Sequence, residues 1–228
     1  MKIHRFFIGE NIKQTKNFRT EDKELIHQLR DVFRLGKGDK VNFFDGTGYE
    51  YLSEIEMLAK KGGSFVILEK TRREERESRK IHLYLAIIKK DKIELAIEKA
   101  TELGVASITP VIAERSQYKQ VREDRLKKLV KEAAEQSGRT TLPEVRLLET
   151  VEEVIARHQD VLVLHIDGTP FSEVSFGKEV CVLIGPEGGW SEKELELFKE
   201  KNIRVVSLPF GTLRAETAAI VASATAQM

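Results

Sequence analysis

The sequence predicts an α/β protein in which a small strand-rich unit precedes a larger α/β domain. Three observations lead to this prediction. Short apolar stretches separated by glycine turns fill residues 1–70, residues 71–80 contain no large apolar side chain, and from residue 81 apolar strands alternate with amphipathic helices. We therefore expect a small barrel at 1–70, a charged linker at 71–80 and a domain with a mainly parallel sheet at 81–228.

The N-terminal unit is predicted from its turns and from one helical repeat. Asp45-Gly46-Thr47-Gly48 and Gly62-Gly63 are typical of turns between strands. The apolar residues Leu25, Leu29, Val32 and Phe33 recur at helical spacing, and Gly36 follows as a stop. The strands are expected at residues 2–8, 41–44, 49–52 and 65–68.

The larger domain is predicted from apolar runs and helix caps. Paired Ser, Thr or Asp and Glu residues, three positions apart, indicate capping boxes at Asp91 and Glu94, at Thr150 and Glu153, and at Ser191 and Glu194. Further helices are expected up to Gly138 and from Ala215 onward. The strands are expected at 81–88, 107–112, 161–166, 180–185 and 203–208.

Composition and charge limit the function. The chain has 228 residues, of which 38 are basic and 37 acidic, so an anionic partner must be bound by local clusters of charge. No apolar run approaches the roughly 18 residues of a membrane span, and no signal peptide is apparent, so no membrane partner is expected. The single cysteine, Cys181, predicts a buried, inert thiol in a reducing compartment, and hence a cytoplasmic protein.

Two basic stretches interrupt this balance. Residues 70–80, which include Arg72 and Arg73, hold six basic and three acidic side chains. They form either a solvated connection or part of a site for an anionic partner, and the sequence leaves both interpretations open. Residues 115–131 carry seven positive and two negative side chains, a net charge of +5. This stretch predicts an RNA-phosphate surface, with a solvated helix face as the alternative.

Glycine, proline and polar residues of the larger domain concentrate in three loops that follow the last three predicted strands. They lie at residues 167–170, 185–190 and 209–217. Ligands of open α/β sheets bind at the carboxyl ends of strands. Gly185, Gly188 and Gly189 would let backbone amides approach a ligand, although a tight turn before a helix cap explains the same residues.

Several familiar sites are absent from the sequence. There is no P-loop, no Gly-x-Gly-x-x-Gly after the first strand of the larger domain and no Gly-x-Ser-x-Gly. The five histidines have no metal-ligand spacing with each other or with Cys181, so no metal is expected. His82 and His165 lie in apolar strands and are interpreted as core residues.

Five blocks in order closely resemble the RsmE family, the 16S ribosomal RNA (uracil-N3)-methyltransferases of the SPOUT superfamily. The resemblance also includes Phe43-Phe44-Asp45-Gly46 and the charged linker, so it spans nearly the whole chain. The blocks are Lys99-Ala-Thr-Glu-Leu-Gly-Val-Ala-Ser-Ile-Thr-Pro-Val, Glu114-Arg115-Ser116, Glu135-Gln-Ser-Gly-Arg-Thr-Thr-Leu-Pro-Glu-Val, Ile184-Gly-Pro-Glu-Gly-Gly-Trp-Ser and Leu213-Arg-Ala-Glu-Thr-Ala.

The resemblance implies a fold, a cofactor and partners that the residues alone do not. The fold would be a small N-terminal PUA-like β-barrel that binds RNA, followed by a SPOUT α/β domain with a C-terminal trefoil knot, in a homodimer. The substrate would be 16S ribosomal RNA, free or in the small ribosomal subunit, and RNA contacts are expected from Arg72, Arg73, Arg115, Arg122 and Arg139. The cofactor would be S-adenosylmethionine, held by Leu164, Ile166, Gly185, Pro186, Glu187, Gly188, Gly189, Leu208, Gly211, Leu213 and Thr217.

The implied reaction is methyl transfer to N3 of a uridine, which is a poor nucleophile until its proton leaves. Arg214 is expected to stabilise charge on the uracil oxygens, and Glu187 and Glu216 are candidates for the base or for acceptors of backbone amides. Two residues depart from the family pattern, because Pro209 has no amide hydrogen and Gly211 replaces an arginine. Two alternatives remain open: methylation of a ribose 2′-hydroxyl or another base, and a non-catalytic RNA-binding assembly factor.

Overall fold

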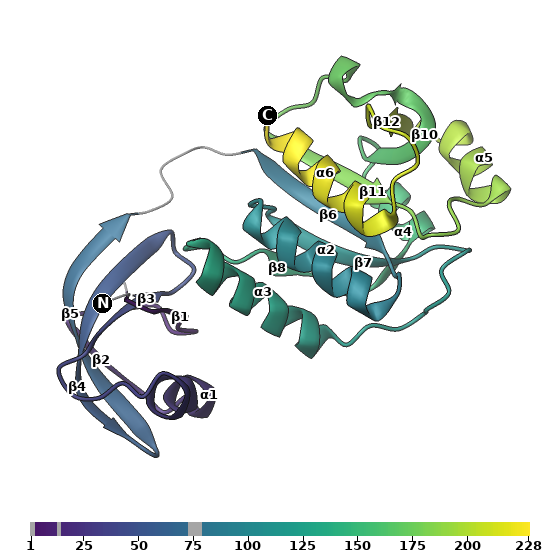
Figure 1. Ribbon diagram of the computed structural model, residues 1–228. Coiled ribbons are helices and arrows are strands. Elements are labelled where there is room, and N and C mark those ends of the chain that lie inside the picture. Colours follow the sequence, from purple (N-terminus) through teal and green to yellow (C-terminus); the bar gives the residue numbers. More distant parts are fainter. Residues whose placement is uncertain (1–2, 13–14, 73–78) are drawn as a thin grey trace. The chain divides into compact units, whose positions relative to one another are not determined.

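A computed structural model describes residues 3–12, 15–72 and 79–228 of the chain (Figure 1). The chain divides into two compact units, Met1–Arg76 with Ala134–Leu142, and Glu77–Ala133 with Pro143–Met228. A short segment from the middle of the chain thus belongs to the N-terminal unit. Most of the predicted linker, including Arg73, lies outside the described residues.

The described part of the N-terminal unit contains a five-stranded sheet in the order β1-β3-β4-β5-β2. All four predicted strands are present; three of them are longer than predicted, and the first is shorter. The strand β2 was not predicted, because its four residues include only one large apolar side chain. The strands are β1 (Arg5–Phe7), β2 (Asn17–Thr20), β3 (Lys40–Phe44), β4 (Tyr49–Ala59) and β5 (Gly62–Arg72).

Aromatic side chains fill the core of this unit. The rings of Phe18, Phe43 and Phe65 contact one another with centroids 4.9–5.1 Å apart. Helix α1 (Lys23–His27) begins where the Asp22 carboxylate accepts hydrogen bonds from two backbone amides. It continues as a turn of π-helix, η1 (Gln28–Val32). The change of helical period turns Val32 outward, so the prediction that Val32 shares a buried helical face with Leu25 and Leu29 is wrong.

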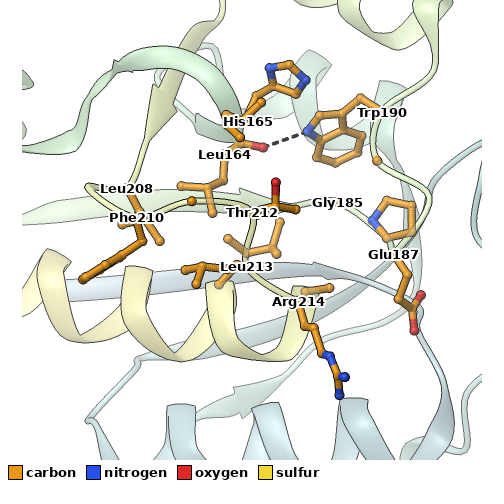
Figure 2. Close-up of a pocket in the computed structure, with 17 residues that line it drawn as sticks. Leu164, His165, Gly185, Glu187, Trp190, Leu208, Phe210, Thr212, Leu213 and Arg214 are labelled. Atoms are coloured by element: carbon orange, nitrogen blue, oxygen red, sulfur yellow. Dashed lines mark hydrogen bonds between the residues drawn. The ribbon is translucent and has the colours of Figure 1, made fainter.

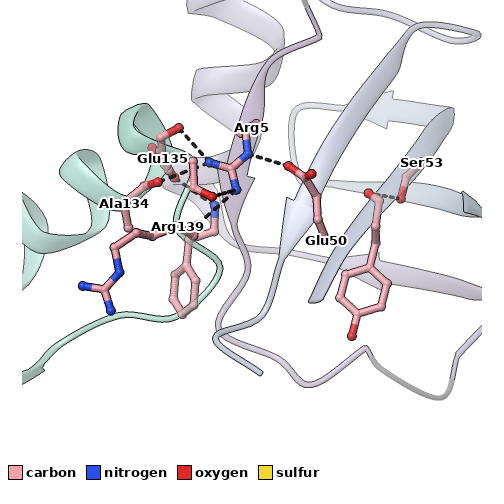
Figure 3. Close-up of polar contacts among 9 residues, drawn as sticks. Arg5, Glu50, Ser53, Ala134, Glu135 and Arg139 are labelled. Atoms are coloured by element: carbon pink, nitrogen blue, oxygen red, sulfur yellow. Dashed lines mark hydrogen bonds and ion pairs between the residues drawn. The ribbon is translucent and has the colours of Figure 1, made fainter. Parts of the chain in front are cut away.

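Arg5 on β1 joins the sheet of the N-terminal unit to the segment Ala134–Leu142 of the same unit (Figure 3). Its guanidinium donates to the backbone oxygens of Ala134, Glu135, Gly138 and Arg139 at 3.0–3.4 Å, and to the carboxylate of Glu50. The last carbonyls of a helix have no partner within the helix. A cation at this end satisfies them and opposes the negative end of the helix dipole.

The second unit contains a sheet in which every described strand pair is parallel. Its order is β12-β10-β11-β6-β7-β8, and β9 also pairs with β7. The five predicted strands are present, and the short strands β8 and β9 are additional. The strands are β6 (Lys80–Ala86), β7 (Ser107–Ile112), β8 (Glu144–Val145), β9 (Glu149–Thr150), β10 (Leu162–Pro170), β11 (Glu179–Ile184) and β12 (Arg204–Ser207).

Helices cover both faces of this sheet, as an apolar parallel sheet requires. In Figure 1, α2 and α6 lie together on one face, where α6 contacts β6 and β11. Apolar residues of α4 and α5 complete the core on the other face. The helices are α2 (Lys90–Glu102), α3 (Glu123–Ser137), α4 (Val151–Arg157), η2 (Phe171–Glu173), α5 (Glu192–Glu200) and α6 (Ala215–Gln227). Within the described ranges, no helix has the length and apolar character needed to cross a membrane.

Two of the three predicted capping boxes are confirmed. Thr150 with Glu153 and Ser191 with Glu194 make both reciprocal hydrogen bonds. The box at Asp91 is wrong, because α2 begins one residue before Asp91 and its N-cap, Lys89, makes no side-chain cap. The Lys89 amide instead donates to Glu187 at 3.2 Å.

Strand β10 contains the main irregularity of the sheet. Leu164 and Thr169 both pair with Val206, so residues 165–168 bulge out of the strand. The prediction of a loop at 167–170 is therefore wrong at its end, where Thr169 and Pro170 return to the sheet. This bulge lies at the carboxyl ends of β10 and β12, where a ligand is expected in an open α/β fold.

Candidate functional site

A cavity of about 400 Å³ opens at the carboxyl ends of β10, β11 and β12 (Figure 2). Three separate stretches of the chain line it: the bulge of β10, the loop after β11, and the loop from β12 into α6. A cavity of this size is within the range of small-molecule sites. Its walls are mainly apolar side chains and loop backbone.

Nine of the eleven residues expected around the cofactor line this cavity. Gly188 and Thr217 are not among its lining residues. The nine are Leu164, Ile166, Gly185, Pro186, Glu187, Gly189, Leu208, Gly211 and Leu213, and the cavity is also lined by His165, Ile184, Trp190, Phe210, Thr212, Arg214, Ala215 and Ala218.

Trp190 fixes one end of the cavity. Its indole is almost fully buried and meets the ring of Phe198 edge-on, with centroids 5.2 Å apart. Its Nε1 donates to the Leu164 carbonyl at 2.9 Å, which ties the loop after β11 to β10 (Figure 2). Gly185 lies against the indole: a Cβ placed there would be 3.0 Å from Cε2 of Trp190. A side chain at 185 would press on the indole, so this position favours glycine.

The glycines of the loop after β11 have different structural roles. The Gly189 amide donates to the Pro186 carbonyl at 2.9 Å, and Gly189 has a φ of +68°, so the loop is a tight turn that ends in a left-handed residue. Gly188 faces Arg115, whose guanidinium donates to its carbonyl at 3.2 Å. The space at Gly188 is therefore taken by Arg115 and not by the cavity.

The loop from β12 into α6 contributes apolar side chains to the rim of the cavity. Phe210 is 56% exposed and Ile166 is 58% exposed, although both line the cavity. The Phe210 amide donates to the Leu208 carbonyl at 2.8 Å, so the chain turns sharply around Pro209. Pro209 itself has no amide hydrogen to offer a ligand.

Arg214 lies at the mouth of the cavity, as the N-cap residue of α6. In Figure 2 its side chain leaves the cavity wall on the side of Glu187, opposite Trp190 and His165. Among the described residues, none forms a hydrogen bond or ion pair with its guanidinium. Its fork of N–H groups is thus available to a planar or anionic group at the mouth.

The two glutamates differ in their surroundings. Glu187 is exposed at the cavity and accepts a hydrogen bond from the Lys89 amide at 3.2 Å. Glu216 is 5% exposed, does not line the cavity and pairs with the Lys92 ammonium at 3.2 Å. Glu216 therefore makes an ion pair within the protein, and Glu187 is the one of these two carboxylates that lines the cavity.

The arginines expected to contact RNA are distributed over both units. Arg115 contacts Gly188, and the exposed Arg122 pairs with Asp124. Arg139 donates to the Thr141 hydroxyl at 3.0 Å in the N-terminal unit. Arg72 is the last residue of β5.

Sequence reasoning missed two kinds of cavity residue. His165 was interpreted as a core residue, but the bulge of β10 places it on the cavity wall. Trp190 and Phe210 lie in loops that the sequence marks as candidate ligand loops, and their position beside the glycines was the available signal. No cluster of three or more metal-ligating side chains occurs in the described ranges.

The single thiol lies outside the cavity. Cys181 is buried in β11, and this burial raises the pKa of its thiol to about 11. A thiol with this pKa is almost fully protonated near neutral pH, so it is a poor nucleophile. The prediction of a buried thiol at this position is confirmed.

Comparisons with known proteins identify the family. A family model described as an RNA methyltransferase domain matches residues 75–227, about two thirds of the chain. The chain belongs to this RNA methyltransferase family. A second model, described as an RNA methyltransferase PUA domain, matches residues 22–68, so this RNA methyltransferase has an N-terminal PUA-like domain before its α/β domain.

Three proteins similar to this RNA methyltransferase match over almost their whole length. Ribosomal RNA small subunit methyltransferase E of Rickettsia conorii is 34% identical, with 98% of this chain and 95% of the relative covered. A methyltransferase of Legionella pneumophila, solved with bound SAM, is 29% identical with a TM-score of 0.91, over 100% of this chain and 98% of that one. Ribosomal RNA small subunit methyltransferase E of Neisseria gonorrhoeae, solved with S-adenosyl methionine, is 28% identical with a TM-score of 0.88, over 99% and 97%.

Proposed function

We propose that this protein transfers a methyl group from S-adenosylmethionine to N3 of a uridine in 16S ribosomal RNA. The observation that carries the proposal is the cavity at the carboxyl ends of β10, β11 and β12, in a chain that matches S-adenosylmethionine-bound methyltransferases from end to end. The specific base follows from the resemblance of the five sequence blocks to uracil-N3 enzymes.

The cavity suits this cofactor in its chemistry. Leu164, Leu208 and Leu213 offer apolar surface to an aromatic base, and the turn at 185–189 offers backbone groups for polar edges. The cofactor supplies a methyl group already activated by its sulfonium. The task of the protein is then to align donor and acceptor and to exclude water. The apolar residues Ile166 and Phe210 at the rim serve the second of these tasks.

Arg214 is the proposed catalytic residue. Its guanidinium lies at the cavity mouth without a partner in the described part of the chain, where it can stabilise charge that develops on the uracil oxygens. Glu187 is the candidate base, because it is the carboxylate exposed at the cavity. Glu216 was the other candidate, and its ion pair with Lys92 supports a structural role.

The domain boundaries and finer fold features also stand as proposals. Residues 1–70 would form a closed PUA-like barrel that holds RNA, 71–80 a linker and 81–228 the catalytic SPOUT domain of a cytoplasmic homodimer. The path from β12 at the sheet edge to α6, which contacts β6, β11 and α2, supports a threaded C-terminus. We take this path to be the trefoil knot that the resemblance implies.

Binding and transfer test the proposal. Calorimetry with S-adenosylmethionine in the presence of a chelator should give one site per chain, and methyl-labelled cofactor should label 16S RNA. Binding without transfer to any RNA would support the non-catalytic assembly factor instead. Loss of binding in chelator would contradict a metal-free site.

A further inference from the structure

A second cavity, of about 230 Å³, lies in the same unit and shares no lining residue with the first. Its floor is formed by Ile87, Ile88 and Ile93, which are each at most 3% exposed. These residues follow β6 and begin α2, so this cavity also lies at the carboxyl edge of the sheet. Neither the proposed cofactor contacts nor the methyl transfer uses it.

Tyr118 stands at the mouth of this second cavity. Its side chain lines the cavity and is 44% exposed. No described residue forms a hydrogen bond with its hydroxyl. The ring therefore offers an open face beside an aliphatic floor.

The polar wall of the second cavity includes Lys90, Gln120 and Arg122, and a bidentate ion pair between Arg125 and Glu94. Arg125 donates through Nε and Nη2 to the two carboxylate oxygens of Glu94, at 3.1 and 2.9 Å. These hydrogen bonds hold the pKa of the Glu94 carboxyl below its usual value, and the positive charge of Lys90 contributes. An arginine has five N–H groups, so this bidentate pair leaves others of Arg125 for a carbonyl oxygen in the cavity.

Two stretches of chain connect the second cavity to the first. Lys89 donates its amide to Glu187 of the first cavity, and the next residue, Lys90, lines the second. Arg115 holds Gly188 of the loop after β11, and Tyr118 is three residues further along the chain. Three residues span at most about 11 Å, so the two cavities are neighbours along one rim. Lys89, Lys90 and Arg115 carry positive charge along this rim, and Lys89 also pairs with Asp91 at 3.5 Å.

We propose that the second cavity binds an unpaired base of the RNA substrate, next to the methylated nucleotide, with that base stacked on Tyr118. This inference rests on the proposed function, because it names the substrate contact of the same enzyme. Proteins that bind single-stranded RNA place bases on aromatic rings and use a positive groove for the phosphates. The exposed ring, the aliphatic floor, the free N–H groups of Arg125 and the basic rim meet each of these requirements.

Kinetics of the full-length protein test the role of Tyr118. Tyr118→Ala should raise the KM for 16S RNA about tenfold, the order of effect seen when a stacking residue is removed, while Tyr118→Phe keeps the wild-type KM. Affinity for S-adenosylmethionine should be unchanged in both variants, which shows that the first cavity is intact. Leu147→Ala is the matched control, since Leu147 is 73% exposed and lines neither cavity. An unchanged KM in Tyr118→Ala would overturn the inference.

Isoleucine methyl resonances give a readout that does not depend on activity. A short single-stranded oligouridine, added to protein saturated with S-adenosylmethionine, should shift the methyl signals of Ile87, Ile88 and Ile93. Shifts confined to Ile166 and Ile184, which line the first cavity, would overturn the inference. If the wild-type enzyme methylates 16S RNA and these signals do not move, the second-cavity site fails while the proposed function stands. If the wild type does not methylate RNA at all, the proposed function itself fails.

Discussion

Gly168→Ala tests the crossing between β10 and β12 that shapes the cofactor cavity. A Cβ at Gly168 would lie 2.4 Å from the carbonyl carbon of Val206 and 2.6 Å from its Cα and N. These are backbone atoms of a paired strand, so no side-chain rotation can relieve the clash, and one strand must shift by about 1 Å to reach ordinary contact. Overpacking of this kind costs about 3 kcal/mol, at the upper end of its usual range.

Such a loss should lower the Tm by about 6–12 °C in a chain of this length. The measurement is thermal unfolding of the purified variant, followed by calorimetry with S-adenosylmethionine, whose affinity should fall because His165 and Ile166 lie in the displaced bulge. Gly177→Ala is the matched control, since nothing lies within 4 Å of a Cβ at that position, and it should behave as the wild type. A Gly168→Ala protein with an unchanged Tm would refute the close crossing.

Three further predictions concern the cavity and the thiol. Gly185→Ala should weaken S-adenosylmethionine binding because its Cβ presses on Trp190, whereas Gly188→Ala meets only Arg115 and should keep the affinity; calorimetry compares the two. Arg214→Ala should lower kcat far more than cofactor affinity, because its contact forms mainly in the transition state, and steady-state kinetics with a normal kcat would contradict this role. Cys181 should resist a thiol reagent at pH 8 in the folded protein and react after denaturation, because burial raises its pKa to about 11; rapid reaction in the native state would show that it is accessible.

The regular elements of the larger domain could be predicted because local signals determine them. The apolar strand runs are followed by polar caps, and Ser191 with Glu194 makes the expected reciprocal hydrogen bonds. Asp91 and Glu94 have the same spacing but form no capping box. The Glu94 carboxylate instead accepts hydrogen bonds from Arg125, 31 residues further along the chain, and the Lys89 amide donates to Glu187. Local spacing cannot reveal such distant partners.

The candidate cavity was predicted in outline and not in detail. The position of three loops after three predicted strands indicated this edge of the sheet, and the family resemblance added the individual residues Leu164 and Leu213. The bulge of β10 was not predictable, since it depends on how Leu164 and Thr169 both pair with Val206. For the same reason His165 was assigned to the core. The knot entered only through the family resemblance, because periodicity carries no information on threading.

The most direct test of the central proposal is the identity of the methylated nucleoside. The full-length protein is incubated with S-adenosylmethionine and either 16S RNA or isolated small subunits from cells that lack the enzyme, and the RNA is digested to nucleosides for mass spectrometry. We predict 3-methyluridine as the new product, lost in Arg214→Ala. A methyl group on a ribose 2′-hydroxyl or on another base, or no product with either substrate, would contradict the account.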